Sequence, residues 1–389
     1  MGSRIWRIVG AAFVGMLGFG AVIPILPVYL HVEAGRSTLV TGLVIGLASA
    51  FALLGRLLAG KVADHRGRRI ALLIGMGFCV VAGILYLPVF GMWGMIPARV
   101  LHGLGEGFFV TAAVAWAVDI APSNRRAQAL GLLSSGIWGG VSVGPAIGQA
   151  LQSMPRVATF LSVSSVVVIG ILLLMKEELR PHAVVKPRWF PPEVGLPGII
   201  LGFGNVTYAA MSGFLILLLR ERGHDTTWAF SAFAFAVLFG RFMFGGLPDR
   251  MGPRKTLLIG YVFFAIGLVT LAVSHNPLTD VPASLAAGLG YSFPWPALAS
   301  VVVSRVPASE RASALGALTA FYDLFVAGSS TVAGAIAGHF GFTAVFWFAF
   351  ASMLVSLVLT LTTSIGAAPV VSAPAALEPE AVRKLAGRP

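Results

Sequence analysis

The sequence predicts an all-α membrane protein whose twelve transmembrane helices form two parallel, pseudo-symmetric six-helix bundles. Of its 389 residues, 57% are hydrophobic and only 11% are charged, whereas about a quarter of the residues in soluble domains are charged. The apolar residues gather in stretches of roughly 20, which is the length a helix needs to cross a bilayer. A long segment of the first half also recurs in the second half. Together these observations leave no room for a separate soluble domain.

The twelve predicted spans follow from the apolar stretches. The first span has an apolar run too long for a signal peptide, and its Gly/Pro-rich interior does not resemble a cleavage site. In chain order the predicted spans are 5–31, 38–60, 70–90, 94–119, 127–152, 156–175, 193–219, 228–247, 255–274, 279–304, 312–336 and 341–362.

An internal repeat relates the two halves of the chain. The segment that begins at Gly55 reappears from Gly240 without a gap, and the same offset aligns Arg126-Ala-Gln-Ala-Leu-Gly with Arg311-Ala-Ser-Ala-Leu-Gly. Six spans per half make the two repeats parallel, related by an axis along the membrane normal. We therefore expect a substrate site between the repeats, near the middle of the bilayer.

The repeat predicts four regions. An N-terminal six-helix bundle spans 1–175, a charged and proline-rich cytoplasmic linker spans 176–192, and a C-terminal bundle spans 193–366. The Ala/Pro-rich tail, 367–389, is predicted to be disordered.

The basic residues are distributed unevenly between the two sets of connections. If the N-terminus is cytoplasmic, the outside connections hold only Arg36, Arg156, Arg220 and Arg222, and most other Lys and Arg residues fall inside. This positive-inside pattern predicts a multi-pass protein of the inner or plasma membrane with both termini in the cytoplasm. The net charge of +12 thus reflects topology, and we expect the lipid bilayer rather than nucleic acid as the partner.

The sequence contains no metal, cofactor or enzyme signature. The lone Cys79 lies within a predicted span, so there is neither a disulfide nor a Cys/His metal pattern. No nucleophile–base pair stands out, and GxGxxG-like spacing in apolar spans is typical of helix packing. We expect a monomer without cofactor, metal or enzymatic activity.

The loop after the second span reads Gly60-Lys-Val-Ala-Asp64-His-Arg-Gly67-Arg68-Arg69. Gly67 permits a tight turn, and Asp64 can accept from backbone N–H groups or pair with a cation. The simpler interpretation of its arginines is a basic loop that anchors to lipid headgroups. As a unit, however, the loop resembles the signature loop of the major facilitator superfamily.

Other motifs resemble the same family over residues 5–362. Arg99-x-x-His102-Gly-x-Gly105 resembles the fourth-helix motif of its proton-coupled members, with His102 where a glutamine is more usual. The run from Gly140 to Gly148 resembles the fifth-helix motif of its antiporters, with Gln149 in place of the usual final glycine. The pair Pro24 and Pro27 resembles the opening of its drug–proton antiporters.

The resemblance implies transport by alternating access, in which two six-helix bundles rock against each other. It also implies that the signature loops help to hold the cytoplasmic side closed. The residues expected to act in this gate are Gly60, Asp64, Gly67, Arg68, Gly245, Asp249, Gly252, Asp119 and Arg126.

The glycines of the fifth predicted helix suggest a hinge. Gly140, Gly144 and Gly148 are four residues apart and form one smooth ridge, which lets a neighbouring helix approach closely. Pro145 removes a backbone donor and bends the helix. Tight packing alone explains the glycines, whereas packing plus a bend at a bundle-to-bundle interface would provide a conformational hinge.

Charged residues inside the spans are the main functional candidates, because a charge at bilayer depth costs about 3 kcal/mol or more. Arg56 and Arg241 are repeat equivalents, so we expect them to serve the shared architecture. Glu106 has no acidic counterpart, because its repeat position is Tyr291.

Helical spacing gives Glu106 two polar neighbours. Arg99, His102 and Glu106 share one helix face. We expect Glu106 to be the principal proton-coupling residue, tuned by Arg99 and His102. The alternative is a permanent ion pair or hydrogen bond between helices.

Asp323 lies near the middle of its span in the opposite half and is predicted to be a second protonation or substrate-binding group. A hydrogen-bonded polar spot between helices is the alternative. Two carboxyls with several aromatic residues would suit a cationic or amphipathic solute. The residues expected to line the substrate cavity are Trp138, Asn205, Tyr208, Tyr291, Trp295 and Tyr322.

These features together predict a secondary active transporter that exports a small organic solute in exchange for protons. The direction depends chiefly on the fifth-helix resemblance. A proton symporter or a facilitative importer on the same fold is the alternative, and a non-transporting membrane sensor is a third.

Overall fold

The computed structural model describes residues 3–122, 125–177, 191–307, 310–363 and 365, without the side chains of Ser3, Arg126, Ala127 and Ala312. The first half contains α1 (Ser3–Val28), α2 (Thr38–Arg66), α3 (Arg68–Leu85), α4 (Gly91–Ile120), α5 (Arg126–Leu151) and α6 (Met154–Leu173). The second half contains α7 (Gly195–Glu221), α8 (Ala229–Phe244), α9 (Leu247–Met251), α10 (Pro253–Val273), α11 (Asp280–Ser292), α12 (Pro294–Arg305), α13 (Arg311–Phe340) and α14 (Phe342–Thr362). The short turns η1 (Tyr29–Glu33), η2 (Pro88–Phe90), η4 (Pro192–Val194) and η5 (Pro277–Thr279) join them. The predicted tail, 367–389, and most of the linker lie outside the described residues.

A helix or a pair of helices lies at each of the twelve predicted spans. In the described part of the chain, 11 helical stretches are long and apolar enough to cross a membrane. The eighth predicted span, 228–247, is shorter than expected, because α8 ends at Phe244 after 16 residues. Gly245 and Gly246 favour the break, and Pro248 is accommodated in the first turn of the separate α9, where no backbone donor is needed. Pro294 similarly divides the tenth span into α11 and α12.

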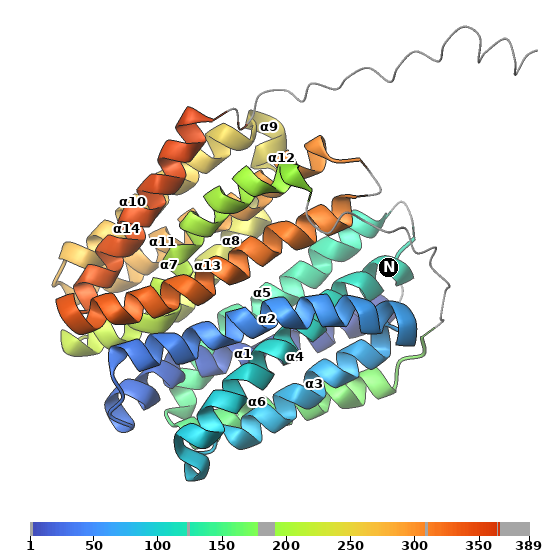
Figure 1. Cartoon of the computed structure of the whole chain (residues 1–389), viewed down its shortest axis with the longest axis horizontal. Coiled ribbons are helices and arrows are strands. Elements are labelled where there is room, and N and C mark those ends of the chain that lie inside the picture. The colour runs from blue at the N-terminus through green and yellow to red at the C-terminus, as the bar shows by residue number, and fades with distance from the viewer. Residues whose placement is uncertain (1–2, 123–124, 178–190, 308–309, 364, 366–389) are drawn as a thin grey trace, which may run out of the picture.

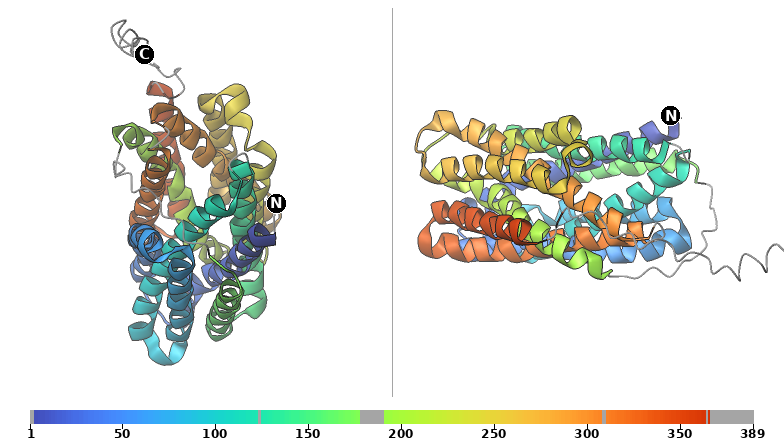
Figure 2. Two further views of the ribbon diagram at one scale, coloured as in Figure 1. Left: turned by 90° about the vertical axis from the view of Figure 1, so that its right-hand side faces the viewer. Right: turned by 90° about the horizontal axis from the view of Figure 1, so that it is seen from above.

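The helices form two bodies with separate hydrophobic cores. One core contains buried residues of α1 to α6, and the other is built mainly from α7 to α14. Figure 1 shows the first half, coloured blue to green, below the second half, with α2 and α13 running side by side between them. Figure 2 shows the same two groups from two further sides. Large apolar side chains such as Phe242 and Val262 remain on the outer surface, as expected where lipid is the solvent.

The two ends of the bundle carry different connections. We call the end that holds Gly67, Glu177 and Gly252 the linker end, and the end that holds η1, η5 and the loop 222–228 the far end. Gly67 and Gly252 occupy equivalent repeat positions and both have positive φ, 102° and 87°. A residue with a Cβ would be strained in this backbone conformation, which explains the glycine in both loops.

Candidate functional site

An ion pair joins the two halves near the middle of the bundle. The Arg56 Nε of α2 donates to Asp323 Oδ2 of α13 at 2.7 Å, and the Arg56 Nη2 lies 3.4 Å from Oδ1. The Asp323 side chain is only 3% exposed. Desolvating both charges is costly, so the pair is stable only because each charge supplies the partner of the other. Asp323 therefore contacts an arginine of the opposite half.

Arg241 occupies the corresponding position of the second half, but it has a different partner. Its guanidinium lies 4.0 Å from the centre of the Trp138 ring of α5. Trp138 and Asp323 are separated by the same offset as Arg56 and Arg241. The second half thus supplies the Asp323 carboxylate to Arg56 of the first half. The first half supplies the Trp138 ring to Arg241 of the second half, in a cation–π contact. No carboxylate of the described residues lies within 4.0 Å of the Arg241 guanidinium.

Glu106 lies half-buried on α4, within electrostatic range of Arg56, Asp323 and Arg99. Among the described residues its carboxylate makes no ion pair within 4.0 Å. It is therefore a carboxylate without a direct partner beside the Arg56–Asp323 pair. Its role in proton coupling stays a prediction.

Arg99 and His102 share a helix face with Glu106, but their polar contacts are made elsewhere. Arg99 donates to the carbonyls of Val44 and Ile45 on α2, at 3.1 and 3.0 Å. The His102 Nδ1 lies 3.0 Å from the Tyr86 hydroxyl, and its ring packs on Phe19. Direct tuning of Glu106 by hydrogen bonds from these two residues is therefore not seen. Their side chains reach different neighbouring helices.

Four of the predicted cavity residues come together around Arg241. Tyr208 stacks on Tyr291 with ring centres 5.7 Å apart, and Tyr322 lies 6.2 Å from Tyr208. Tyr291 and Tyr322 are within electrostatic range of Arg241, and Trp138 contacts it directly. The result is an aromatic group with one cation.

The other two predicted cavity residues differ. Asn205 is buried on the same face of α7 as Tyr208, and its Nδ2 has no hydrogen-bond partner in the described structure. Trp295 packs against the core of the second half, as Tyr208 and Tyr322 also do, but no ring contact joins it to them in the described structure. Sequence reasoning alone does not separate this packing residue from the central tyrosines, because both are aromatic residues at similar predicted depth.

The glycine ridge of α5 lies against α1 of the same half, and a hinge at this position stays a prediction. A Cβ on Gly140 would lie 2.5 Å from the Phe13 carbonyl, and one on Gly144 would lie 2.7 Å from the Gly20 Cα. Gly148 similarly meets the backbone of Ala21, and Pro145 remains inside a continuous helix. The ridge faces α1 because the opposite half is reached by another face of α5, where the Ser142 hydroxyl donates to the Ala234 carbonyl at 2.8 Å.

The first signature loop is held by ion pairs within its own half. The Arg68 Nη1 contacts Asp64 Oδ1 at 2.5 Å, and its Nε contacts Asp119 Oδ2 at 3.1 Å. Gly60 lies near the end of α2. The side chain of Arg126 lies outside the described residues.

Glu177 is a further residue of this loop that sequence reasoning missed. Its two carboxylate oxygens accept from the backbone N–H groups of Arg68 and Arg69 at the start of α3, at 2.5 and 3.0 Å. A carboxylate at a helix N-terminus satisfies orphan donors and is favoured by the helix dipole. Glu177 is 109 residues from Arg68 in sequence, so no local pattern indicates this contact.

The second signature loop lacks the equivalent ion pairs in the described structure. Pro253 stands where the repeat places Arg68, and Ser304 stands where it places Asp119. Asp249 is exposed and makes no ion pair with the described residues. Gly245 follows α8 directly, and Gly252 supplies the turn before α10. The two predicted gate loops are therefore chemically different.

Close contacts join the two halves toward the far end. Gly46 of α2 approaches α13 so closely that a Cβ would lie 2.5 Å from the Ala327 carbonyl, and Gly42 likewise meets Ser330. On the other side of the molecule the Gln149 Nε2 of α5 donates to the Thr226 carbonyl at 3.3 Å. Small residues permit such close helix approach. The halves are thus packed together between the central ion pair and the far end.

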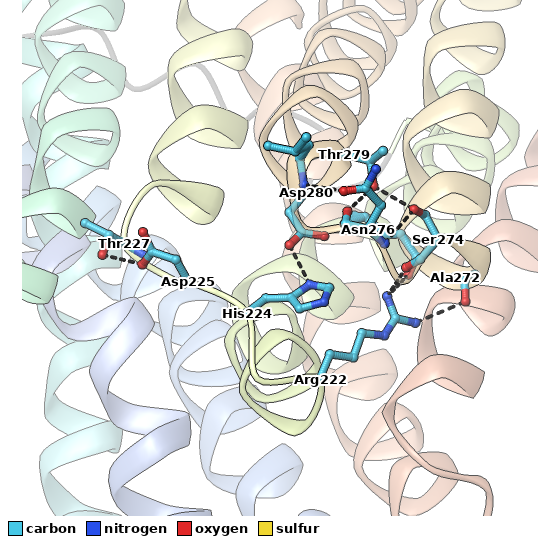
Figure 3. Close-up of polar contacts among 11 residues, drawn as sticks. Arg222, His224, Asp225, Thr227, Ala272, Ser274, Asn276, Thr279 and Asp280 are labelled. Carbon is cyan, nitrogen blue, oxygen red and sulfur yellow. Dashed lines mark hydrogen bonds and ion pairs between the residues drawn. The ribbon is translucent and has the colours of Figure 1, made fainter.

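A polar cluster fixes the far-end loop of the second half (Figure 3). The His224 Nδ1 lies 2.8 Å from Asp280 Oδ2, with both side chains buried. Arg222 donates to carbonyls at the end of α10, including those of Ala272 and Ser274. Cations are favoured at a helix C-terminus, so this loop is tied to both α10 and α11.

A sequence model of the Major Facilitator Superfamily matches residues 8–223 and 198–387. The chain belongs to this superfamily. It is therefore a multi-pass membrane transporter rather than an enzyme, and its substrate is a small molecule.

Similar proteins agree with this membership. An uncharacterized MFS-type transporter of Salmonella typhimurium is 28% identical over 90% of this chain and 94% of its own length. Another from Pseudomonas aeruginosa is 27% identical over 92% of both chains. Among solved structures, the nucleoside transporter NupG superposes with a TM-score of 0.75 at 13% identity, and the human organic anion transporter MFSD10 with 0.67 at 15%. Each of these superpositions covers 92% of this chain and 98% of the other, and at such identities they show the fold alone.

Proposed function

We propose that this transporter couples the movement of a small organic solute to protons, with Glu106 as the proton-binding residue. The observation that carries the proposal is the position of Glu106 beside the Arg56–Asp323 pair, within electrostatic range but without an ion pair of its own. A carboxylate that is free to gain or lose a proton there changes the charge beside the contact between the two halves. Protonation can then alter how firmly the halves hold together.

Alternating access provides the transport step. The far-end contacts at Gly46 and Gln149 would open as the linker end closes, and the Arg56–Asp323 pair lies at the boundary between these regions. The distribution of basic residues supports a cytoplasmic linker end. Asp64, Arg68, Asp119 and Glu177 would then hold the cytoplasmic gate of the first half.

Two directions of coupling have support. The fifth-helix run from Gly140 to Gly148 resembles that of antiporters, which supports export in exchange for protons. Proton symport is the second candidate, and the central charges favour it. Arg56, Arg99 and Arg241 outnumber Glu106 and Asp323 among the charges within the spans, so an anion and a proton on Glu106 would bind together.

The test is proton movement in proteoliposomes that contain purified protein and an internal pH-sensitive dye. Benzenesulfonate and phenyltrimethylammonium, one permanent anion and one permanent cation, serve as probes. We expect a probe gradient to drive proton movement in the wild type and not in Glu106→Gln. The sign of the pH change separates exchange from symport.

Glu221→Gln removes an exposed carboxylate at the end of α7 and serves as the matched control. It should couple normally. Thermal unfolding in detergent verifies that Glu106→Gln is folded. Proton movement at the wild-type rate in Glu106→Gln would show that the assignment of Glu106 is wrong.

A further inference from the structure

The strongest unexplained group in the molecule is the Arg241 guanidinium. It lies in the last turn of the apolar helix α8, and its Nε is buried without a hydrogen-bond partner among the described residues. A buried cation without a counter-charge is costly and usually faces a partner or a wet cavity. The contact with the Trp138 ring offsets part of this cost, but it leaves the Nε donor without a hydrogen-bond partner among the described residues.

The internal repeat shows what is missing. Arg56, the repeat equivalent of Arg241, pairs with Asp323 and lies within electrostatic range of Glu106. At the equivalent positions around Arg241 the chain places Trp138 and Tyr291. Both carboxylates are thus replaced by aromatic rings, while the arginine is retained.

We infer that Arg241 binds the anionic group of the transported solute, and that the solute is a small aromatic anion such as a carboxylate or sulfonate. The guanidinium donates in a planar fork that matches such an anion. Trp138 contacts the guanidinium, Tyr291 and Tyr322 lie within electrostatic range of it, and Tyr208 packs beside both tyrosines. Such rings can stack on the body of an aromatic solute. The anion of the solute would supply the counter-charge for Arg241, as Asp323 does for Arg56.

The charges of the site disfavour the opposite class of solute. Asp323 is already paired with Arg56, so it is not free to bind a cation, and Arg241 would repel one. This differs from the cationic or amphipathic solute that two free carboxyls would suit. The inference deepens the proposed function and rests on it, because a deprotonated Glu106 would repel the same anion and its protonation would admit it.

Binding to the purified full chain in detergent tests the inference. The probes are benzenesulfonate, neutral benzenesulfonamide and cationic phenyltrimethylammonium, and binding is followed by tryptophan fluorescence and by the rise in melting temperature. We expect benzenesulfonate to bind at least about 10-fold more tightly than the other two, as expected for a charge-assisted hydrogen bond. Preferential binding of the cation, or no saturable binding of benzenesulfonate, would overturn the inference.

Two variants examine Arg241 itself. Arg241→Gln should weaken benzenesulfonate binding by about 10-fold or more. Trp138→Asp should abolish binding, because its carboxylate would occupy the guanidinium of Arg241 in place of the anion. We expect this variant to fold, because the new carboxylate neutralises the buried cation. Tyr261→Phe is the matched control, because Tyr261 is a buried tyrosine that bonds Ser356 and Thr360 elsewhere in the same half. Undiminished binding in folded Trp138→Asp or Arg241→Gln would refute the site.

The Glu106→Gln variant separates this inference from the proposed function. It should bind benzenesulfonate at high pH at least as tightly as the wild type, because a neutral side chain replaces the repelling carboxylate. Loss of proton coupling without any anion binding would refute the anion site and leave the role of Glu106 standing. Anion binding together with normal proton coupling in Glu106→Gln would refute the role of Glu106 and leave the anion site standing.

Discussion

The two halves of this transporter share a packing plan and differ in the chemistry placed on it. Gly105 of α4 meets Cys79 and Gly75 of α3, and Gly290 of α11 meets Phe264 and Gly260 of α10 at equivalent repeat positions. The close helix crossings within each half are therefore reproduced by the repeat. Small residues at these crossings set how closely the backbones approach, so the plan survives wide changes elsewhere.

The central charges do not follow the repeat. Arg56 has Asp323 as its partner and Glu106 nearby, whereas Arg241 has Trp138 and lies near Tyr291. The packing shared by the two halves thus places Arg56 beside carboxylates of the protein and Arg241 beside aromatic rings. This difference teaches that the pseudo-symmetry supplies equivalent positions, whereas the side chains at those positions set their chemistry. At Arg56 they form an ion pair between the halves, and at Arg241 we propose a site for the solute.

A second difference concerns which helix of an equivalent packed pair carries the glycine at the contact. In the first half, Gly140 of α5 accommodates Met16 and the backbone of α1. In the second half the small residue is on the other partner, where Gly202 of α7 accommodates the Phe325 ring of α13. Gly140 and Phe325 are repeat equivalents. Close packing is kept although the large and small residues have exchanged helices, as complementarity requires.

The largest effect is expected from breaking the ion pair. Asp323→Asn leaves the Arg56 guanidinium buried without a counter-charge and should cost about 3–5 kcal/mol of stability. Arg241→Gln removes only a cation–π contact of about 0.5–2 kcal/mol. Thermal and denaturant unfolding in detergent would compare the two.

A charge exchange sharpens the same comparison. Arg56→Asp combined with Asp323→Arg restores opposite charges across α2 and α13 and should recover part of the lost stability. If Arg241→Gln destabilises the protein as much as Asp323→Asn does, the asymmetry between the two arginines is wrong.

An intermediate effect is expected from the exchanged glycines. Gly202→Leu forces a side chain into the Phe325 ring and should cost about 1–3 kcal/mol through overpacking. Combining it with Phe325→Gly transfers the arrangement of the first half to the second, and some stability should return. Gly204→Ala is the control on the same helix, because the nearest atom to its Cβ would be 3.8 Å away. Equal losses in Gly202→Leu and Gly204→Ala, measured by unfolding, would contradict the packing argument.

The smallest effect is expected at the far-end cluster of the second half. Asp280 is the first residue of α11, where the helix dipole stabilises a negative charge. Asp280→Asn keeps an acceptor for His224 and removes the charge, so it should cost about 0.3–1 kcal/mol. The repeat equivalent of Asp280 is Met95, and Met95→Leu provides a neutral comparison in the first half. A loss larger than that of Asp323→Asn in the same unfolding assay would reverse the expected order.

The sequence predicted the features that depend on composition and local order. Apolar stretches of membrane length indicate the spans, because the bilayer imposes length and hydropathy on each helix separately. The two occurrences of one loop indicate the halves. Breaks at Gly245 and Pro294 were less predictable. They depend on how a glycine or proline is accommodated by neighbouring helices.

Side-chain partners were beyond local reasoning. Arg99, His102 and Glu106 share a face, but a helix in a bundle has several neighbours, and residues three to seven positions apart reach different ones. Arg56 and Asp323 are 267 residues apart, and no local sequence feature of either span identifies the other residue as its partner. The α5 glycines likewise reveal a smooth surface without revealing that α1 covers it.

The sequence by itself determined the class of protein, the spans, the repeat and which buried charges require an explanation, because each follows from the cost of polar groups in lipid. Only the tertiary structure decided which charges are neutralised. It paired Asp323 with Arg56, left Glu106 without an ion pair among the described residues, and placed the Trp138 ring beside Arg241. Pairing is a property of how two helices from opposite halves approach each other, and that approach is set by the packing of the whole bundle.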